Sequence, residues 1–207
     1  MRWRIGLSAM LAALTGVVAS VAQGGDGGIT VEGSGPQELT VTVGGRDLAD
    51  AGRLELGDEF WDRGEKEAAV RHFAQIVEGP EVSGLEAKAR YRLGLCHLQN
   101  GDGEAAVGMW QEASLDRSDP DAAAWSQYCL AWMESGRGGG KKAIAMFQAI
   151  IDAQLAGDED VYAWSLYQIG RIHQQWLHDY EAADAAFKKV MSLHPHSEPA
   201  LRNCWRQ

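Results

Sequence analysis

Residues 93–113 read LGLCHLQNGDGEAAVGMWQEA, and this stretch decides the fold. Leu93-Gly94 precedes a break at Gly101-Asp102, where glycine and aspartate are typical turn residues. Beyond the break, Ala106 is followed four residues later by Trp110, and this spacing places both side chains on one face of a helix. The stretch therefore predicts two helices joined by a short turn.

The same pattern occurs four times along the chain. The alanine of the second helix recurs at intervals of 37, 37 and 40 residues, as Ala69, Ala106, Ala143 and Ala183. Four residues after each alanine stands a large aromatic residue: Phe73, Trp110, Phe147 and Phe187. The first helices carry the pairs Leu56-Gly57, Leu93-Gly94, Tyr128-Cys129 and Ile169-Gly170. A ring follows each pair by three residues: Phe60, His97, Trp132 and His173. A fixed period of this length indicates stacked repeats.

A packing reason is needed for a glycine that recurs within helices, because glycine costs about 1 kcal/mol there relative to alanine. We expect the small residue to let the partner helix approach closely, with the repeated alanine at the crossing and the aromatic ring beside it. One such helix pair cannot bury its apolar face alone, so the pairs must stack.

The pattern resembles the tetratricopeptide repeat, whose signature is a Leu-Gly pair, an aromatic residue, and then alanine, aromatic, alanine and proline. The matching residues are Leu56-Gly57, Phe60, Ala69, Phe73 and Pro80; Leu93-Gly94, Ala106, Trp110, Ala113 and Pro120; Trp125, Trp132, Ala143 and Phe147; and Ile169-Gly170, Ala183, Phe187 and Pro195. The departures are Cys129 in place of glycine, a lengthened turn at residues 136–140, and one extra residue near His178. The 37-residue spacing is similar to that of periplasmic members attached to outer-membrane assembly and cell-division machinery.

The resemblance implies an all-α fold, a right-handed solenoid of about four helix-turn-helix units with a C-terminal capping helix. The expected repeats span residues 47–82, 83–119, 120–157 and 158–196, and the expected cap spans residues 197–207. In the cap, Ala200, Leu201 and Trp205 would cover the exposed face of the fourth unit.

The N-terminal segment has the features of a secretory signal peptide. Arg2 and Arg4 precede an uncharged, mainly apolar run, and Ser20-Val21-Ala22 supplies the small residues of a cleavage site. We therefore expect residues 1–22 to be removed on export to the periplasm or the medium. Residues 23–46 form a glycine-rich linker in which 29–43 is β-prone, so that a short hairpin is an open alternative.

Composition excludes several classes of function. The chain has 207 residues and a formal charge of -10, which argues against general binding to nucleic acid or to anionic membranes. No Cys-x-x-Cys, His-Glu-x-x-His or Gly-x-Ser-x-Gly motif occurs, so we expect no metal, no cofactor and no catalytic residues. The cysteines number three; either all stay unpaired, or one pair, such as Cys96 with Cys129, is oxidised.

A second stripe remains on the first helices after the core positions are removed. By resemblance to the family, these helices line a concave groove. Its apolar members would be Trp61, Tyr91, Leu95, Leu98, Leu130, Met133, Trp164 and Tyr167, with Asp58, Lys88, Arg92 and Arg171 as polar neighbours. The acidic residues Asp58, Asp62 and Glu134 favour a partner with basic groups. The family's clamp for C-terminal carboxylates is not expected, because Asp58 would repel the ligand.

Two functions follow from this reading. The first is an exported scaffold that binds a protein or peptide partner through the concave groove. The alternative is a structural subunit of a bacterial cell-envelope complex that binds through its convex face. Neither involves nucleic acid or a membrane span after removal of the signal peptide.

Overall fold

The computed structural model describes residues 19–21, 29–32, 40–43, 47–79 and 83–204. Ala22 at the expected cleavage site, most of the linker, and Trp205 of the expected cap lie outside these residues. The chain divides into two compact units, Met1–Leu85 and Glu86–Gln207.

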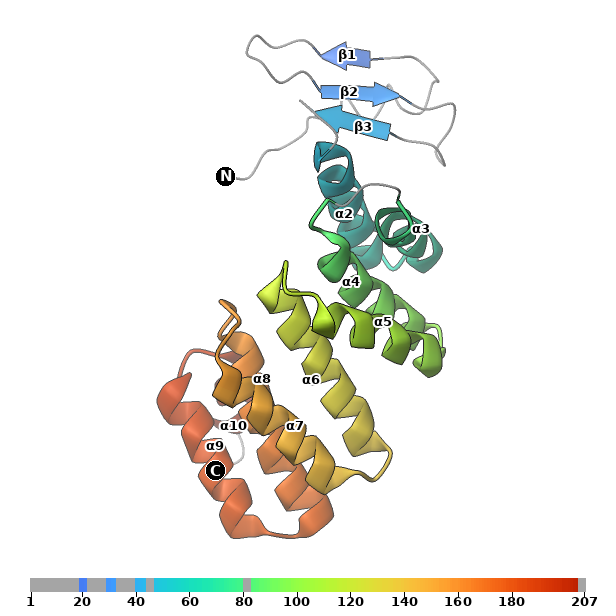
Figure 1. Ribbon diagram of the computed structural model, residues 1–207. Helices are drawn as coiled ribbons and strands as arrows, with labels where there is room; N and C mark the ends of the chain where they lie inside the picture. Colours follow the sequence, from blue (N-terminus) through green and yellow to red (C-terminus); the bar gives the residue numbers. More distant parts are fainter. Residues whose placement is uncertain (1–18, 22–28, 33–39, 44–46, 80–82, 205–207) are drawn as a thin grey trace. The chain divides into compact units, whose positions relative to one another are not determined.

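The first unit combines a small sheet with one helix pair (Figure 1). Its strands are β1 (Ala19–Val21), β2 (Ile29–Glu32) and β3 (Thr40–Val43), and its helices are α2 (Asp47–Asp62) and α3 (Lys66–Val77). The sheet is antiparallel in the order β1-β2-β3, and Ile29 pairs with both Val21 and Val43. The antiparallel pairing of β2 with β3 is the short hairpin that the sequence allowed within residues 29–43 without deciding whether it forms. The strand β1 was not expected, because its residues fall in the segment assigned to the signal peptide.

The second unit consists of helices. These are α4 (Glu86–Gln99), α5 (Gly103–Leu115), α6 (Pro120–Gly136), α7 (Gly140–Ala153), α8 (Asp160–Ile172), the π-helix η1 (His173–Leu177), α9 (Tyr180–Leu193) and α10 (Glu198–Cys204). Consecutive helices pack as pairs, and the first helices are neighbours as well, since α4 contacts α6 and α6 contacts α8. None of the helices in the described residues is both long enough and apolar enough to cross a bilayer.

The recurring spacing between the glycine and the aromatic ring has a direct steric cause, which differs from the one expected. A Cβ built on the glycine would lie 2.5 Å from Phe73 Cε1 at Gly57, 2.4 Å from Trp110 Nε1 at Gly94, and 2.6 Å from Phe187 Cε1 at Gly170. The ring of the second helix, rather than the backbone of that helix, therefore occupies the space above the glycine. Phe73 and Trp110 are fully buried there.

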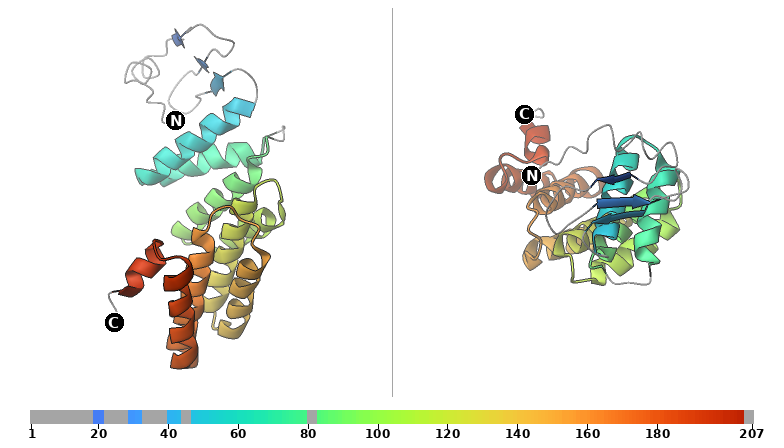
Figure 2. Two further views of the ribbon diagram at one scale, coloured as in Figure 1. Left: turned by 90° about the vertical axis from the view of Figure 1, so that its left-hand side faces the viewer. Right: turned by 90° about the horizontal axis from the view of Figure 1, so that it is seen from above.

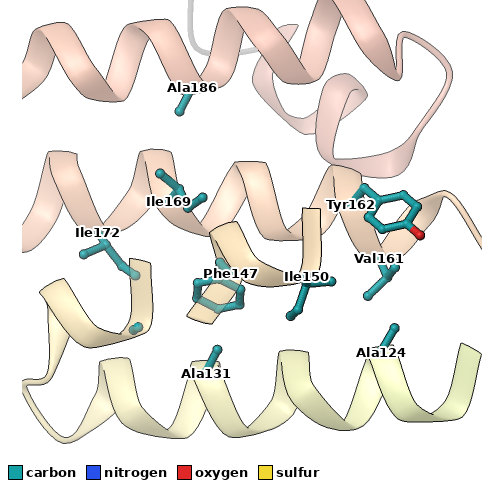
Figure 3. Close-up of a cluster of buried hydrophobic side chains, with 10 residues drawn as sticks. Ala124, Ala131, Phe147, Ile150, Val161, Tyr162, Ile169, Ile172 and Ala186 are labelled. Atoms are coloured by element: carbon teal, nitrogen blue, oxygen red, sulfur yellow. The ribbon is translucent and has the colours of Figure 1, made fainter. Parts of the chain in front are cut away.

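The third repeat places Ala131, not Cys129, at this position. Ala131 stands twelve residues before Ala143, the same interval that separates the glycine from the alanine in the first two repeats. Ala131 is fully buried and points toward Phe147 in the core cluster of α6, α7 and α8 (Figure 3). Cys129 instead packs with Ala106 and with the indole of Trp110, both on α5 of the preceding helix pair. The assignment of Cys129 to the glycine position is thus wrong by two residues.

The turns follow the corrected register. Gly64, Gly101 and Gly138 have left-handed φ values of 77°, 84° and 87°, and each stands seven residues after its small residue. Glycine adopts this conformation without the steric cost that a side chain adds. The turn between α6 and α7 has the same length as the two before it, so the expected lengthening at residues 136–140 does not occur.

The fourth repeat accommodates its extra residue as a π-helix. η1 continues directly from α8, and the left-handed turn residue is His178 with φ 52°. One extra residue in an α-helix would rotate the following chain by about 100°. The wider π-helical turn absorbs that residue, so Ala183 still faces the core with 3% exposure.

The capping helix packs differently from the expectation. α10 contacts α8 and α9 (Figure 2), and Ser197 Oγ accepts a hydrogen bond from the Ala200 backbone N–H at 3.4 Å. Ala200 is buried as expected, whereas Leu201 is 56% exposed. Arg202 on the next position lies over the ring of Trp164 on α8, with its Cζ 5.2 Å from the ring centroid.

Candidate functional site

Five of the predicted groove residues come together on α4 and α6. These five side chains are partly buried and pack, together with Tyr128, around a small buried core. The five are Tyr91, Leu95, Leu98, Leu130 and Met133, and the core consists of Ala106, Trp110 and Cys129. The Trp110 indole N–H also donates to the Tyr91 carbonyl oxygen at 3.2 Å. These residues form one half-buried apolar surface, and they also support the core beneath it.

The remaining predicted residues have different surroundings. Trp61 and Asp58 lie half-buried on α2 in the first unit. Lys88 and Arg92 are half-buried on α4, and the Arg92 guanidinium lies 5.9 Å from the ring centroid of Tyr91.

Tyr167 departs from the expectation of an exposed groove residue. It is only 7% exposed, and it packs in a core cluster with Val190 and Ala200. Its neighbour Trp164 is half-buried, stacked edge-on against Tyr167, and covered by Arg202. Both aromatic residues therefore belong to the junction of α8 with the cap.

The corrected register adds a residue that the sequence analysis had assigned to the core. The position after the small residue is occupied by Asp58, Leu95, Trp132 and Arg171 in the four repeats. Trp132 is 42% exposed, so it lies on the surface stripe rather than in the ring position of the core. Leu130, which had been placed on the stripe, takes the position of the leucine in the Leu-Gly pairs.

Trp132 borders a cleft between α6, α8 and η1 with a volume of about 410 Å³. We call it the Trp132–Trp176 cleft. Its lining residues are Trp132, Met133, Ser135, Gly136, Arg137, Gln168, Arg171, Ile172, Gln175 and Trp176. Trp176 on the π-helix is 55% exposed. Sequence reasoning did not single out Trp176; the extra residue near His178 was the available signal.

Hydrogen bonds hold several side chains of this cleft in place. The Gln168 amide Nε2 donates to Tyr128 Oη at 2.8 Å, and Arg171 Nη2 donates to Gln175 Oε1 at 3.3 Å. Burial raises the pKa of Tyr128 to about 12, although the hydrogen bond from Gln168 lowers it. Tyr128 therefore stays neutral at physiological pH and acts as a fixed acceptor.

A second cleft of about 500 Å³ lies on a different side of α6, between the loops that flank α6 and α7. Leu115 and Leu155 line it and are 81% and 76% exposed. Asp121 Oδ1 orders one of these loops by accepting hydrogen bonds from the backbone N–H groups of Gly157 and Asp158, at 2.6 Å and 3.0 Å.

The described residues contain no group of three or more His, Cys, Asp or Glu side chains that could hold a metal ion. Cys96 and Cys129 are both buried, and burial raises the pKa of the Cys129 thiol to about 12. A thiol with such a pKa is a poor nucleophile.

Stacked helix pairs, each with a small residue beneath an aromatic ring, define a helical-repeat protein. Two stretches, residues 54–123 and 164–197, match family models described as tetratricopeptide repeat, and together they span about half of the chain. The chain belongs to the tetratricopeptide repeat family. Members of this family are typically non-catalytic scaffolds for protein partners. No protein with a curated description matches the chain.

Solved structures agree with this assignment. MamA is 20% identical with a TM-score of 0.51, and the match covers 68% of this chain and 75% of that chain. A tetratricopeptide repeat protein from Parabacteroides merdae ATCC 43184 is 17% identical with a TM-score of 0.56, covering 73% and 56%. YrrB, described as a TPR protein with an unusual peptide-binding site, is 20% identical with a TM-score of 0.52, covering 75% and 74%. These likenesses confirm the all-α solenoid class.

Proposed function

We propose that the chain is an exported, non-catalytic scaffold that binds a segment of a protein partner along α4, α6 and α8, the first helices of the repeats in its second unit. The observation that carries the proposal is the exposed Trp132 beside a cleft, next to the half-buried apolar surface of α4 and α6. Exposed aromatic residues beside apolar surface are typical of binding sites. The peptide-binding site named for YrrB supports the same use of this fold by analogy.

The export part of the proposal rests on the N-terminal sequence. Arg2, Arg4, the apolar run and Ser20-Val21-Ala22 form the pattern of a cleavable signal. Edman sequencing of the protein recovered from the periplasm or the medium should begin near Gln23. An exported protein that retains Met1 would contradict cleavage, and a protein found only inside the cell would contradict export.

The binding part is tested by a quantitative pulldown from the cell-envelope fraction. Trp132→Ala is the test variant, and Leu193→Ala is the matched control, because Leu193 is 63% exposed on α9 and does not line the cleft. Leu193→Ala should melt close to the wild type, because that residue is 63% exposed. Trp132 is 42% exposed, so Trp132→Ala should lower the melting temperature somewhat, and circular dichroism establishes that the variant is folded before the pulldown. The partner should be lost from Trp132→Ala and retained by Leu193→Ala. A folded Trp132→Ala variant that retains every partner would refute binding at this surface.

A second candidate function is favoured by the other cleft. A structural subunit of an envelope complex would bind through a surface other than the Trp132–Trp176 cleft, and the exposed Leu115 and Leu155, at the end of α5 and after α7, supply an apolar contact there. In that case Leu155→Ala, and not Trp132→Ala, would lose the partner in the same pulldown.

A further inference from the structure

The charge of the Trp132–Trp176 cleft is opposite to that of the whole chain. The chain carries a formal charge of -10, yet the ten residues that line the cleft include two arginines and no carboxylate. The acidic residue nearest in sequence, Glu134, is paired with Lys142 at 3.2 Å. This differs from the sequence-based expectation of a partner with basic groups, which relied in part on Glu134.

The two arginines are available to a ligand in different ways. The Arg137 side chain is exposed and has no hydrogen bond or ion pair to any of the residues that the structure describes. Arg171 is half-buried on α8 and held by Gln175 Oε1, a neutral partner that leaves its positive charge uncompensated. A carboxylate satisfies a guanidinium better than an amide does, because the hydrogen bonds are then charge-assisted and bidentate.

The other lining groups suit a peptide. Trp132 and Trp176 present exposed indole rings that can pack against an apolar or aromatic side chain. Gln168 gives its N–H to Tyr128, which leaves its carbonyl oxygen free to accept from a peptide N–H. Gln175 accepts from Arg171, which leaves its N–H group as a donor for a peptide carbonyl. A volume of about 410 Å³ holds two or three side chains rather than a folded domain.

We infer that the Trp132–Trp176 cleft binds an extended segment of the partner protein in which an aspartate or glutamate side chain adjoins an aromatic or large apolar residue. The carboxylate bonds to Arg171 and Arg137, and the neighbouring side chain packs between the two indole rings. This inference rests on the proposed function and specifies its partner. The ligand group is a side-chain carboxylate, so no free C-terminus is required.

The test is selection from a random twelve-residue peptide library displayed on phage without a free peptide C-terminus, against the immobilised full chain. Enriched peptides should contain Asp or Glu next to Trp, Tyr, Phe, Leu, Ile or Met. Synthetic versions with blocked ends are then titrated by fluorescence anisotropy. Affinity should fall several-fold when salt is raised from about 50 mM to about 500 mM, because the contact is electrostatic.

Four variants identify the site. Arg171→Gln should weaken binding about tenfold or more, and Arg171→Lys should restore part of it by returning the charge. Trp132→Ala should weaken binding about tenfold. Arg117→Gln is the matched control, because Arg117 is an exposed arginine that lines the second cleft, and it should bind like the wild type.

The possible failures are distinct. Neutral or basic peptides that depend on Trp132 would overturn the carboxylate specificity and leave the proposed binding surface intact. Acidic peptides that depend on Arg117 would overturn the inference by placing the site at the second cleft. If no enriched peptide depends on Arg171 or Trp132, the inference is refuted, and the envelope pulldown with Trp132→Ala then decides the proposed function separately.

Discussion

Replacing Gly94 by alanine should destabilise the second unit, although the same replacement usually stabilises a helix. A Cβ at this position would lie 2.4 Å from Trp110 Nε1 and 2.7 Å from Trp110 Cδ1, closer than carbon atoms pack. Trp110 is fully buried, so its indole cannot swing into solvent. The ring must shift, and the 3.2 Å hydrogen bond from its N–H to the Tyr91 carbonyl must lengthen or break.

The magnitude follows from three contributions. Overpacking of a well-packed core costs about 1–3 kcal/mol. Loss of the indole hydrogen bond costs about 1 kcal/mol. The gain in helix propensity from glycine to alanine returns about 1 kcal/mol. The net destabilisation is about 1–3 kcal/mol, and a value of about 2 kcal/mol corresponds to a fall in melting temperature of about 4–8 °C.

Urea unfolding followed by circular dichroism measures this change, with Gly108→Ala as the control. Gly108 lies inside α5, and a Cβ there would meet no heavy atom within 4 Å. Gly108→Ala should therefore stabilise the chain by up to about 1 kcal/mol. If Gly94→Ala proves neutral, or as stabilising as the control, the steric explanation of the recurring glycine is wrong.

Three further predictions concern individual side chains. Tyr167→Ala should cost about 3 kcal/mol in thermal or urea unfolding, because its side chain is buried at the junction with α10; a cost near zero would return Tyr167 to the exposed groove. A thiol reagent should label Cys96 and Cys129 slowly in the native protein and quickly in urea, as read by peptide mass mapping, because both are buried and burial raises the pKa of Cys129. Hydrogen bonds from the Ser118 backbone N–H and hydroxyl lower the pKa of Asp116 below its value in the unfolded chain. The ionised Asp116 therefore contributes to stability above about pH 4, and this contribution is lost as the pH falls through the pKa of the folded state. Carboxyl NMR should show that pKa rising in Ser118→Ala.

The repeat pattern could be predicted from sequence because it rests on spacing alone. Ala106 and Trp110 lie on the core face that their four-residue separation indicates, and both are fully buried. The third repeat was predicted in the wrong register, because Tyr128-Cys129 was matched to the Leu-Gly pairs of the other repeats. Counting twelve residues back from Ala143, or seven back from the turn glycine Gly138, selects Ala131 instead.

The candidate site was harder to predict, since exposure depends on how neighbouring helices cover one another. Tyr91 and Tyr167 share one repeat position, yet Tyr167 is buried because α10 packs beside it. Trp132 looked like a core ring only while the register was wrong. Trp176 belongs to the π-helical turn that accommodates the one extra residue, so the regular repeat spacing does not indicate which way its side chain faces. The spacing in the sequence shows that one residue is extra, but it does not show that the extra residue forms a π-helical turn or which side chains this turn exposes.

The π-helix η1 separates two tasks within one repeat. The small residue, the ring and the turn residue maintain the stacking, and they tolerate one extra residue because the wide turn keeps Ala183 facing the core. The same wide turn supplies Gln175 and Trp176 to the lining of the cleft. Deletion of one residue from 173–177 would therefore give a chain that keeps its stacking and loses one wall of its cleft.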